Sequence, residues 1–147
     1  MNLLREIHPD FLYHLNFKDQ GLVDLYMDLR NYILKLYPDS YELLYHTHAL
    51  TSLYSVSPKM GDAFCMIPIY TNHLNLGFNK GTMLDDPDHM LQGTGKFIRH
   101  VPIKNKDTYK STSLQRLIQA SIEYSLNDTD ATIVKPGITI SKIKKKH

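Results

Sequence analysis

Residues 72–103, NHLNLGFNKGTMLDDPDHMLQGTGKFIRHVPI, contain the strongest indication of the fold in this chain. Two apolar runs, His73–Phe78 and Phe97–Ile103, lie on either side of a polar loop that ends in Gly93-Thr94-Gly95-Lys96. Short apolar runs bounded by glycine, proline and asparagine are typical of β-strands. The stretch therefore predicts two strands joined by a long polar loop. The strands are placed at Leu74–Phe78 and at Arg99–Ile103, with Phe97 as the alternative start of the second.

Two further strands are expected before this stretch. Leu50–Val56 and Ala63–Tyr70 are rich in β-type residues, and Ser57–Asp62 between them has the composition of a turn. Pro68 cannot donate a ladder hydrogen bond, so it predicts an edge position or a bulge for the second of these strands. Tyr41–Leu50 fits either a helical turn or an extended segment. The short links between the successive strands require antiparallel pairing.

Two amphipathic helices are expected, one before the strands and one after them. In the first, apolar residues recur at three- and four-residue steps from Leu22 to Tyr37, and Pro38 ends the helix. In the second, Thr112 and Gln115 form a capping box. The expected inner face of the first helix is Leu22, Leu25, Tyr26, Leu29, Ile33 and Leu36, and its other faces have Asp24, Asp28, Arg30 and Lys35. The expected inner face of the second is Leu114, Leu117, Ile118, Ser121, Ile122 and Ser125, and Asn127-Asp128 end it.

The order of these elements predicts an α+β fold in a single domain, residues 1–147. Helices before and after an antiparallel sheet give a two-layer sandwich, in which the flanking helices pack on a mainly antiparallel sheet. Residues 1–20 are expected to form short helical turns against this body. The β-type residues of the C-terminal segment predict either a further strand or a frayed end: Ile133, Val134, Ile138 and Ile140.

Composition limits the classes of function. The chain has 147 residues, 42% of them hydrophobic and 22% charged, which is typical of a globular domain. The net charge is only +2 and owes much to the lysines of Lys142–His147, so no specific nucleic-acid partner is predicted. No apolar run has the length of a membrane helix, and no signal peptide is recognised, so no membrane partner is expected. One cysteine, Cys65, suits a core residue in a reducing compartment, and the cytoplasm is the expected location.

The central stretch resembles the YdhG-like domain family. The matching residues are His73-Leu74-Asn75-Leu76-Gly77-Phe78, Gly81, Asp86-Pro87, Leu91-Gln92-Gly93-Thr94-Gly95-Lys96 and Arg99-His100-Val101. The resemblance covers about residues 22–126, and residues 127–147 form a basic C-terminal extension. It implies a frataxin-like α/β sandwich. One branch of that family is described as an iron chaperone, which would imply metal handling at an acidic surface.

The glycine-rich end of the loop is the first candidate site. Glycines let backbone amides converge on an anion, and nearby cations can complete such a nest. The glycine spacing is not that of a P-loop. The alternative interpretation is a plain glycine-rich turn that leads into a strand. The candidate anion-binding residues are Lys80, Gly93, Thr94, Gly95, Lys96, Arg99 and His100.

Two groups of residues are candidates for metal binding. Asp85, Asp86 and Asp88, with His89 beside them, could provide oxygen ligands for a hard cation, although their spacing is not that of a calcium loop. A solvated acidic loop is the alternative. His46 and His48 would share one face of a strand and could chelate a transition metal with a third ligand, or could be two exposed histidines.

The residues do not assign an enzymatic activity. No nucleophile has a base at a recognised spacing, and Cys65 falls in the middle of a strand. No general acid or base and no cofactor is identified. The sequence therefore favours a protein without catalysis.

Three functions remain open at this point. The first is binding of a small anionic ligand, or of an anionic group on a partner, near the Gly93–Lys96 loop. The second is binding or delivery of iron or another metal at the acidic loop. The third is protein interaction or self-association, for example as a homodimer. Removal of Lys142–His147 is expected to leave folding and specific ligand binding intact.

Overall fold

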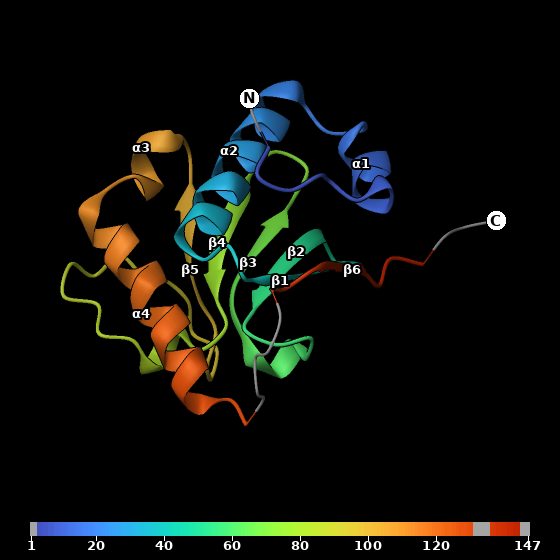
Figure 1. Ribbon diagram of the computed structural model, residues 1–147. Helices are drawn as coiled ribbons and strands as arrows, with labels where there is room; N and C mark the ends of the chain where they lie inside the picture. The colour runs from blue at the N-terminus through green and yellow to red at the C-terminus, as the bar shows by residue number, and fades with distance from the viewer. Residues whose placement is uncertain (1–2, 131–135, 145–147) are drawn as a thin grey trace.

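The computed structural model describes residues 3–130 and 136–144, which form one α+β body (Figure 1). Among the described residues, two α-helices precede the strands of a single sheet, and two more lie between its fifth and sixth strands. The helices are α1 Pro9–Leu15, α2 Gln20–Leu36, α3 Lys106–Tyr109 and α4 Thr112–Asp128, and the two 3-10 turns are η1 Met60–Asp62 and η2 Gly81–Met83. The strands are β1 Tyr41–His46, β2 Leu50–Ser55, β3 Ala63–Ile69, β4 Leu74–Phe78, β5 Arg99–Ile103 and β6 Thr139–Ser141.

The six-stranded sheet has the order β5-β4-β3-β2-β1-β6. Strands β1 to β5 form an antiparallel meander, and β6 returns to pair in parallel with β1, with Leu43 opposite Ile140. The meander follows from the short links, because strands joined by a few residues can only pair antiparallel. The predicted α+β class with a mainly antiparallel sheet is confirmed.

Helices α2 and α4 lie against the same face of the sheet (Figure 1). Tyr26 of α2 donates a hydrogen bond to Ser52 of β2, at 3.0 Å between the two oxygens. Cys65 of β3 lies 3.7 Å from Ser121 of α4, between sulfur and oxygen. All six residues expected on the inner face of α4 are buried. A smaller cluster, Leu43, Leu53 and Ala63, is buried on the opposite face of the sheet.

Several local predictions are corrected. For Tyr41–Leu50 the extended alternative holds: the segment forms β1, a turn and the first residue of β2. Arg30, expected on an outer face of its helix, is 1% exposed, which corrects that prediction. The capping box at Thr112 is wrong: Ser111 is the N-cap, and its hydroxyl accepts from the Leu114 amide at 3.2 Å. Both residues can cap a helix, but Ser111 has the extended backbone that an N-cap needs.

The edge or bulge expected at Pro68 is also wrong. Strand β3 lies between β2 and β4, and Pro68 pairs with Thr51 in a regular register. The bulge of this strand pair lies elsewhere, at Tyr54/Ser55. The β3–β4 pairing is interrupted around Pro68, between the pairs formed by Met66 and Ile69. The missing amide of proline therefore falls where the ladder is open.

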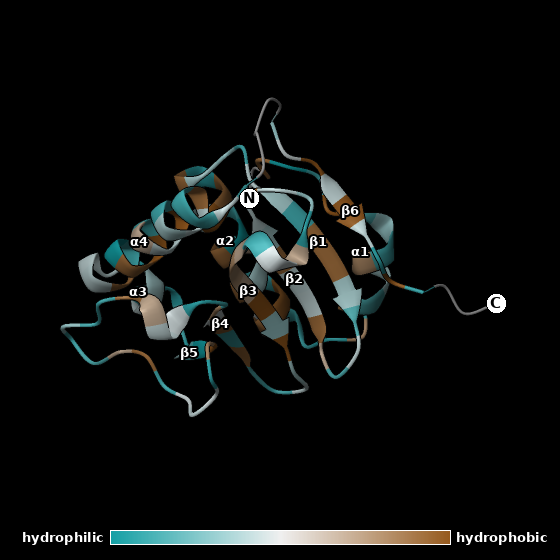
Figure 2. Ribbon diagram, turned by 90° about the horizontal axis from the view of Figure 1, so that it is seen from below, coloured by the Kyte–Doolittle hydropathy of each residue, from teal (hydrophilic) through white to brown (hydrophobic). Residues whose placement is uncertain are grey.

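The two ends of the chain partly match expectation. The helical turn expected before Gln20 is α1, and β6 is the strand that was one alternative for the C-terminal segment. Ile140 lies within β6 and Ile138 just before it, whereas Ile133 and Val134 lie outside the described residues. Figures 1 and 2 both show α1 and β6 at the same end of the sheet, with the C-terminal segment leading away from them.

Candidate functional site

The two ends of the loop that carries the first candidate site are held together. The Thr82 amide donates to the Phe97 carbonyl at 3.0 Å, and the Thr82 hydroxyl donates to the Lys96 carbonyl at 3.3 Å. Gly81 packs directly on Arg99, since a Cβ at Gly81 would lie 2.5 Å from the Arg99 Cβ. The segment after Lys80 and the segment around Lys96 therefore lie side by side.

Two of the cations in this loop already have protein partners. The Arg99 guanidinium donates from one nitrogen to the Gly95 carbonyl at 2.5 Å and to the Ile98 carbonyl at 2.9 Å. Lys80 forms an ion pair with Asp128 at 2.8 Å. The turn thus directs carbonyl oxygens at Arg99, and Lys96 is exposed with its ammonium 5.3 Å from the Phe97 ring centre.

Gly93, Thr94 and His100 are the other candidates of this loop whose surroundings the structure shows. Gly93 has φ +125°, a conformation that favours glycine, and Thr94 is exposed. His100 is half-buried in β5, and its amide and carbonyl pair with those of Gln92 at 2.9 and 2.8 Å. Of the predicted cations, Lys96 is thus the one that faces solvent without an ion pair among the described residues.

The acidic loop does not gather its carboxylates. Asp86 accepts hydrogen bonds from the amides of Met90 and Leu91, at 2.9 and 2.8 Å, which is a turn-forming role. Asp88 accepts from the Ser113 hydroxyl, and Asp85 is exposed. Within residues 3–130 and 136–144, no three histidine, cysteine or acidic side chains come together in a group that could hold a metal ion.

The histidine pair is divided between a strand and a turn. His46 ends β1 and packs edge-on against His14 of α1, with the ring centres 4.4 Å apart. His48 lies in the turn that follows.

Cys65 is a core residue, as expected. Its side chain is fully buried in β3, and burial raises the pKa of the thiol to about 12. A thiol with such a pKa remains protonated near neutral pH and is a poor nucleophile.

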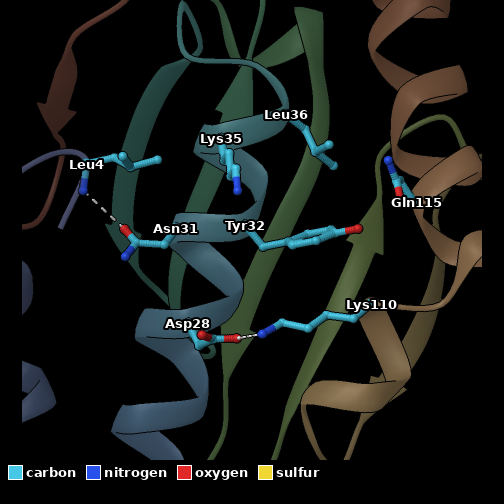
Figure 3. Close-up of a pocket in the computed structure, with 8 residues that line it drawn as sticks. All are labelled: Leu4, Asp28, Asn31, Tyr32, Lys35, Leu36, Lys110 and Gln115. Atoms are coloured by element: carbon cyan, nitrogen blue, oxygen red, sulfur yellow. Dashed lines mark hydrogen bonds and ion pairs between the residues drawn. The ribbon is translucent and has the colours of Figure 1, made fainter. Parts of the chain in front are cut away.

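An open depression with a volume of about 570 Å³ lies between α2 and the α3–α4 segment (Figure 3). We call it the α2–α4 depression. Its walls come from α2, from the start of α4 and from the N-terminal segment, and most of its lining residues are polar. The lining residues are Leu4, Asp28, Asn31, Tyr32, Lys35, Leu36, Lys110 and Gln115.

Asp28 organises one side of the α2–α4 depression. It accepts a hydrogen bond from the Tyr109 hydroxyl, and the ammonium groups of Lys110 and Lys106 lie 3.3 and 3.9 Å from its oxygens. Burial alone would raise the pKa of Asp28, but the Tyr109 hydrogen bond and the two lysines outweigh burial and lower it. Asp28 is therefore a carboxylate at neutral pH and holds Lys110 at the edge of the depression.

Three polar groups of the α2–α4 depression are available to a ligand. The Tyr32 hydroxyl, the Lys35 ammonium and the Gln115 amide contact no protein hydrogen-bond partner in the described part of the chain. Burial raises the pKa of Tyr32, so its hydroxyl remains a neutral donor. Figure 3 shows Tyr32 between Lys35 and Lys110. With Lys106 nearby, three ammonium groups face one carboxylate, and the local charge is positive.

The sequence alone did not indicate this depression. Asp28 and Lys35 have the spacing of solvent-facing residues on an amphipathic helix, and Lys106 and Lys110 fall in a polar linker. The only available signal was the run of lysines at Lys104, Lys106 and Lys110 just before a helix N-terminus. That run does not indicate that Lys35 lies opposite.

Comparison with known proteins does not supply an assignment. No family model, curated protein or solved structure matches this chain. Among the described residues, no helix has both the length and the apolar character needed to cross a membrane. We therefore infer the function from the geometry of the chain itself.

Proposed function

We propose that this protein is a non-enzymatic binding domain for a small anionic ligand, held in the α2–α4 depression. The observation that carries the proposal is the pair of ammonium groups, Lys35 and Lys110, on either side of the unpartnered Tyr32 hydroxyl. A phosphate or carboxylate group is the matching chemistry, because its oxygens accept hydrogen bonds from both lysines and from tyrosine. Gln115 provides a further donor for the same group.

The depression is open to solvent, and this limits the affinity expected for a ligand. Lys110 is 47% exposed, and its charge is partly offset by Asp28. Exposed charges in water attract each other weakly and are screened by salt. We therefore expect modest affinity for a small anion, with weaker binding at high ionic strength.

The Gly93–Lys96 loop is the second position proposed for the same class of ligand. Lys96 and Thr94 are exposed there, and the glycines permit close approach to the backbone. The engagement of Lys80 with Asp128 and of Arg99 with two carbonyls favours the α2–α4 depression over this loop.

A thermal-shift comparison separates the two positions. Melting is followed in inorganic phosphate and in sodium chloride at equal ionic strength, for the wild type and two double variants. Lys35→Ala with Tyr32→Phe removes ligand groups of the depression without touching Asp28. Lys96→Ala with Arg99→Ala is the matched variant in the loop. Phosphate stabilises a protein that binds it in the folded state.

The expected result is a phosphate-dependent rise in Tm that the Lys35/Tyr32 variant loses and the Lys96/Arg99 variant keeps. The opposite pattern would assign the ligand to the loop. A phosphate effect that is absent from the wild type, or that survives in both variants, would exclude both positions.

We also propose membership of the YdhG-like family and a cytoplasmic location. The spaced pattern from His73 to Val101 supports the first. The α+β body with its mainly antiparallel sheet agrees with it. The single cysteine, buried and unpaired, supports a reducing compartment.

A further inference from the structure

A row of aromatic rings lies exposed at the α1 end of the molecule. Phe17 and Tyr13 have ring centres 5.4 Å apart, Tyr13 and His14 5.1 Å, and His14 and His46 4.4 Å. We call these four residues the aromatic row. Phe17 is 75% exposed and Tyr13 61% exposed. Neighbouring exposed rings on a small protein commonly mark a binding surface.

A second aromatic pair adjoins the same end. Tyr70 and His73 stack at 4.7 Å with an angle of 17° between their planes, at the turn that joins β3 to β4. Lys18, which follows Phe17, donates its ammonium to the Tyr70 carbonyl at 3.2 Å. Lys18 thus connects this pair to the α1 segment and places a positive charge between the two sets of rings.

The basic C-terminal segment leaves the sheet beside the aromatic row. Leu44 of β1 pairs with Ser141 of β6, and the Lys142 amide donates to the Leu44 carbonyl at 2.7 Å. Two residues after Leu44, β1 ends at His46, a member of the row. The Ser141 hydroxyl donates to Asp10 of α1 at 2.7 Å. Figures 1 and 2 show the segment leading outward from this place.

The charges at this end favour a polyanion. Lys18, Lys142 and Lys144 are the lysines that the described chain places here. The carboxylates of Asp10 and Asp19 lie near these lysines and offset part of their charge, but both are held within the protein. Asp10 accepts from Ser141, and Asp19 accepts from the Gly21 amide as the N-cap of α2.

We propose that this end of the molecule binds single-stranded nucleic acid without sequence preference. Bases stack on the exposed rings of Phe17 and Tyr13, and Lys142 and Lys144 contact phosphates. Aromatic platforms beside a cationic path are the chemistry that holds single strands, because every base has a face that can stack. The sequence of residues 142–147 contains no phenylalanine, tyrosine or tryptophan, and the rings come instead from α1, the residues just after it and the end of β1.

Single-stranded nucleic acid fits this surface better than a duplex or a membrane does. A duplex hides its base faces, so exposed rings gain little from it. A membrane surface attracts lysines and aromatic rings too, but two of the four rings in the row are imidazoles. Imidazoles lose hydration when they are buried among lipid chains.

The test is a fluorescence-anisotropy titration of a labelled 15-mer of deoxythymidine with the full chain. Three variants accompany the wild type: Tyr13→Ala with Phe17→Ala, Lys142→Gln with Lys144→Gln, and Phe97→Ala. Phe97 is the matched control, because its ring is 51% exposed beside Lys96 on another part of the surface. Circular dichroism checks that each variant keeps the fold, because substitutions of exposed side chains should not change it.

The expected outcome is saturable binding of the single strand. Loss of the two rings should weaken binding by about 5- to 150-fold for each base that stacks. Loss of the two lysines should reduce the dependence of log K on log salt by about 0.7 for each phosphate that the protein no longer neutralises. Phe97→Ala should bind as the wild type does.

Four outcomes would overturn the proposal: absence of binding, equal affinity for a duplex of the same length, binding to phosphatidylserine vesicles alone, or unchanged affinity in the ring variant. Phosphate binding at the α2–α4 depression is a separate measurement, so either proposal can fail without the other.

Discussion

At the scale of single residues, the most consequential feature is the buried pair Arg30 and Glu42. Each side chain is 1% exposed, and two hydrogen bonds of 2.7 and 3.0 Å join the guanidinium to the carboxylate. The Tyr54 and Thr139 hydroxyls donate to the same carboxylate. The guanidinium nitrogen Nη1 donates to the Arg5 carbonyl at 2.7 Å, and Nη2 donates to the Glu6 carbonyl at 3.1 Å. The pair therefore joins α2, three strands and the N-terminal segment.

Glu42→Gln should strongly destabilise the fold. The substitution leaves the Arg30 guanidinium buried without its counter-charge, which costs about 3–5 kcal/mol in comparable sites. Urea denaturation measures the change in free energy of unfolding. The control is Lys80→Gln, which breaks the more exposed pair with Asp128 and should cost less than about 1 kcal/mol. Equal effects of the two substitutions would show that burial of the pair is unimportant.

Stability should fall on the acid side because of the same residue. Burial alone would raise the pKa of Glu42, but its bonds to Arg30 outweigh burial and hold the pKa below the ordinary value of 4.5. As the pH falls, the Glu42 carboxylate of the unfolded chain is therefore protonated before that of the folded chain. The stabilising contribution of Glu42 is full above pH 4.5 and is lost as the pH falls through the lower pKa of the folded state. Urea denaturation from pH 7 to pH 3 should show the difference between wild type and Glu42→Gln shrinking below about pH 4.5. A difference that stays constant over this range would contradict the lowered pKa.

At the scale of elements, local patterns predicted α2, α4 and β2 to β5, and the bounds expected for β4 and β5 are those of the structure. Hydrophobic periodicity identified the buried face of α4, because burial and periodicity have the same cause. In α2 it identified only part of that face: Tyr26, Leu29 and Ile33 are buried as expected, whereas Leu22, Leu25 and Leu36 are half-buried. It did not place the α4 cap, since Ser111 and Thr112 are both capping residues and only the backbone distinguishes them. Arg30 was misplaced because its partner Glu42 lies on a strand that the sequence left ambiguous.

Ser111→Ala should destabilise the protein by about 1 kcal/mol, because the Leu114 amide loses its acceptor. Thr112→Ala is the paired control. Thr112 is exposed and lies inside the first turn, so its removal should change the free energy of unfolding by less than about 0.5 kcal/mol. Chemical denaturation of both variants decides the matter. A larger loss for Thr112→Ala would restore the cap predicted from sequence.

Gly137→Ala should detach β6 from the sheet. A Cβ at this position would lie 2.4 Å from the Tyr41 nitrogen and 2.5 Å from the Asp39 carbonyl oxygen, so backbone must move. The Gly137 amide also donates to Asp39 at 2.9 Å. Hydrogen exchange should show faster exchange of the Lys142 amide in this variant. Gly61→Ala is the control, since nothing lies within 4 Å of its added Cβ, and normal protection in both variants would refute the close approach.

At the scale of the whole molecule, the sequence predicted the fold class but not the favoured site. The meander follows from short links and alternating residues, which are local properties. The α2–α4 depression depends on the packing of two distant helical segments, and neither Lys35 nor Lys110 has a local pattern that indicates binding. Glycine-rich loops attract attention in a sequence, whereas the fold has engaged Arg99 and Lys80 within the protein.

The same limitation applies to the edges of the sheet. At the β5 edge, His100 pairs with Gln92, and Pro102, the next residue facing outward, has no amide hydrogen to donate. These two features block that edge against a further strand. At the other edge, β6 has only three residues and is followed by lysines. Sequence alone had placed the suspected edge at Pro68, in what is an interior strand.

The most direct test of the central claim is a two-dimensional ¹⁵N–¹H NMR titration of the full chain with inorganic phosphate, at constant ionic strength. We predict saturable shifts of the backbone amides of Tyr32, Lys35, Lys110 and Gln115, with the amides of Gly93, Gly95 and Lys96 unmoved. Saturable shifts confined to the Gly93–Lys96 loop, or no saturable shift at all, would contradict the assignment of the ligand to the α2–α4 depression.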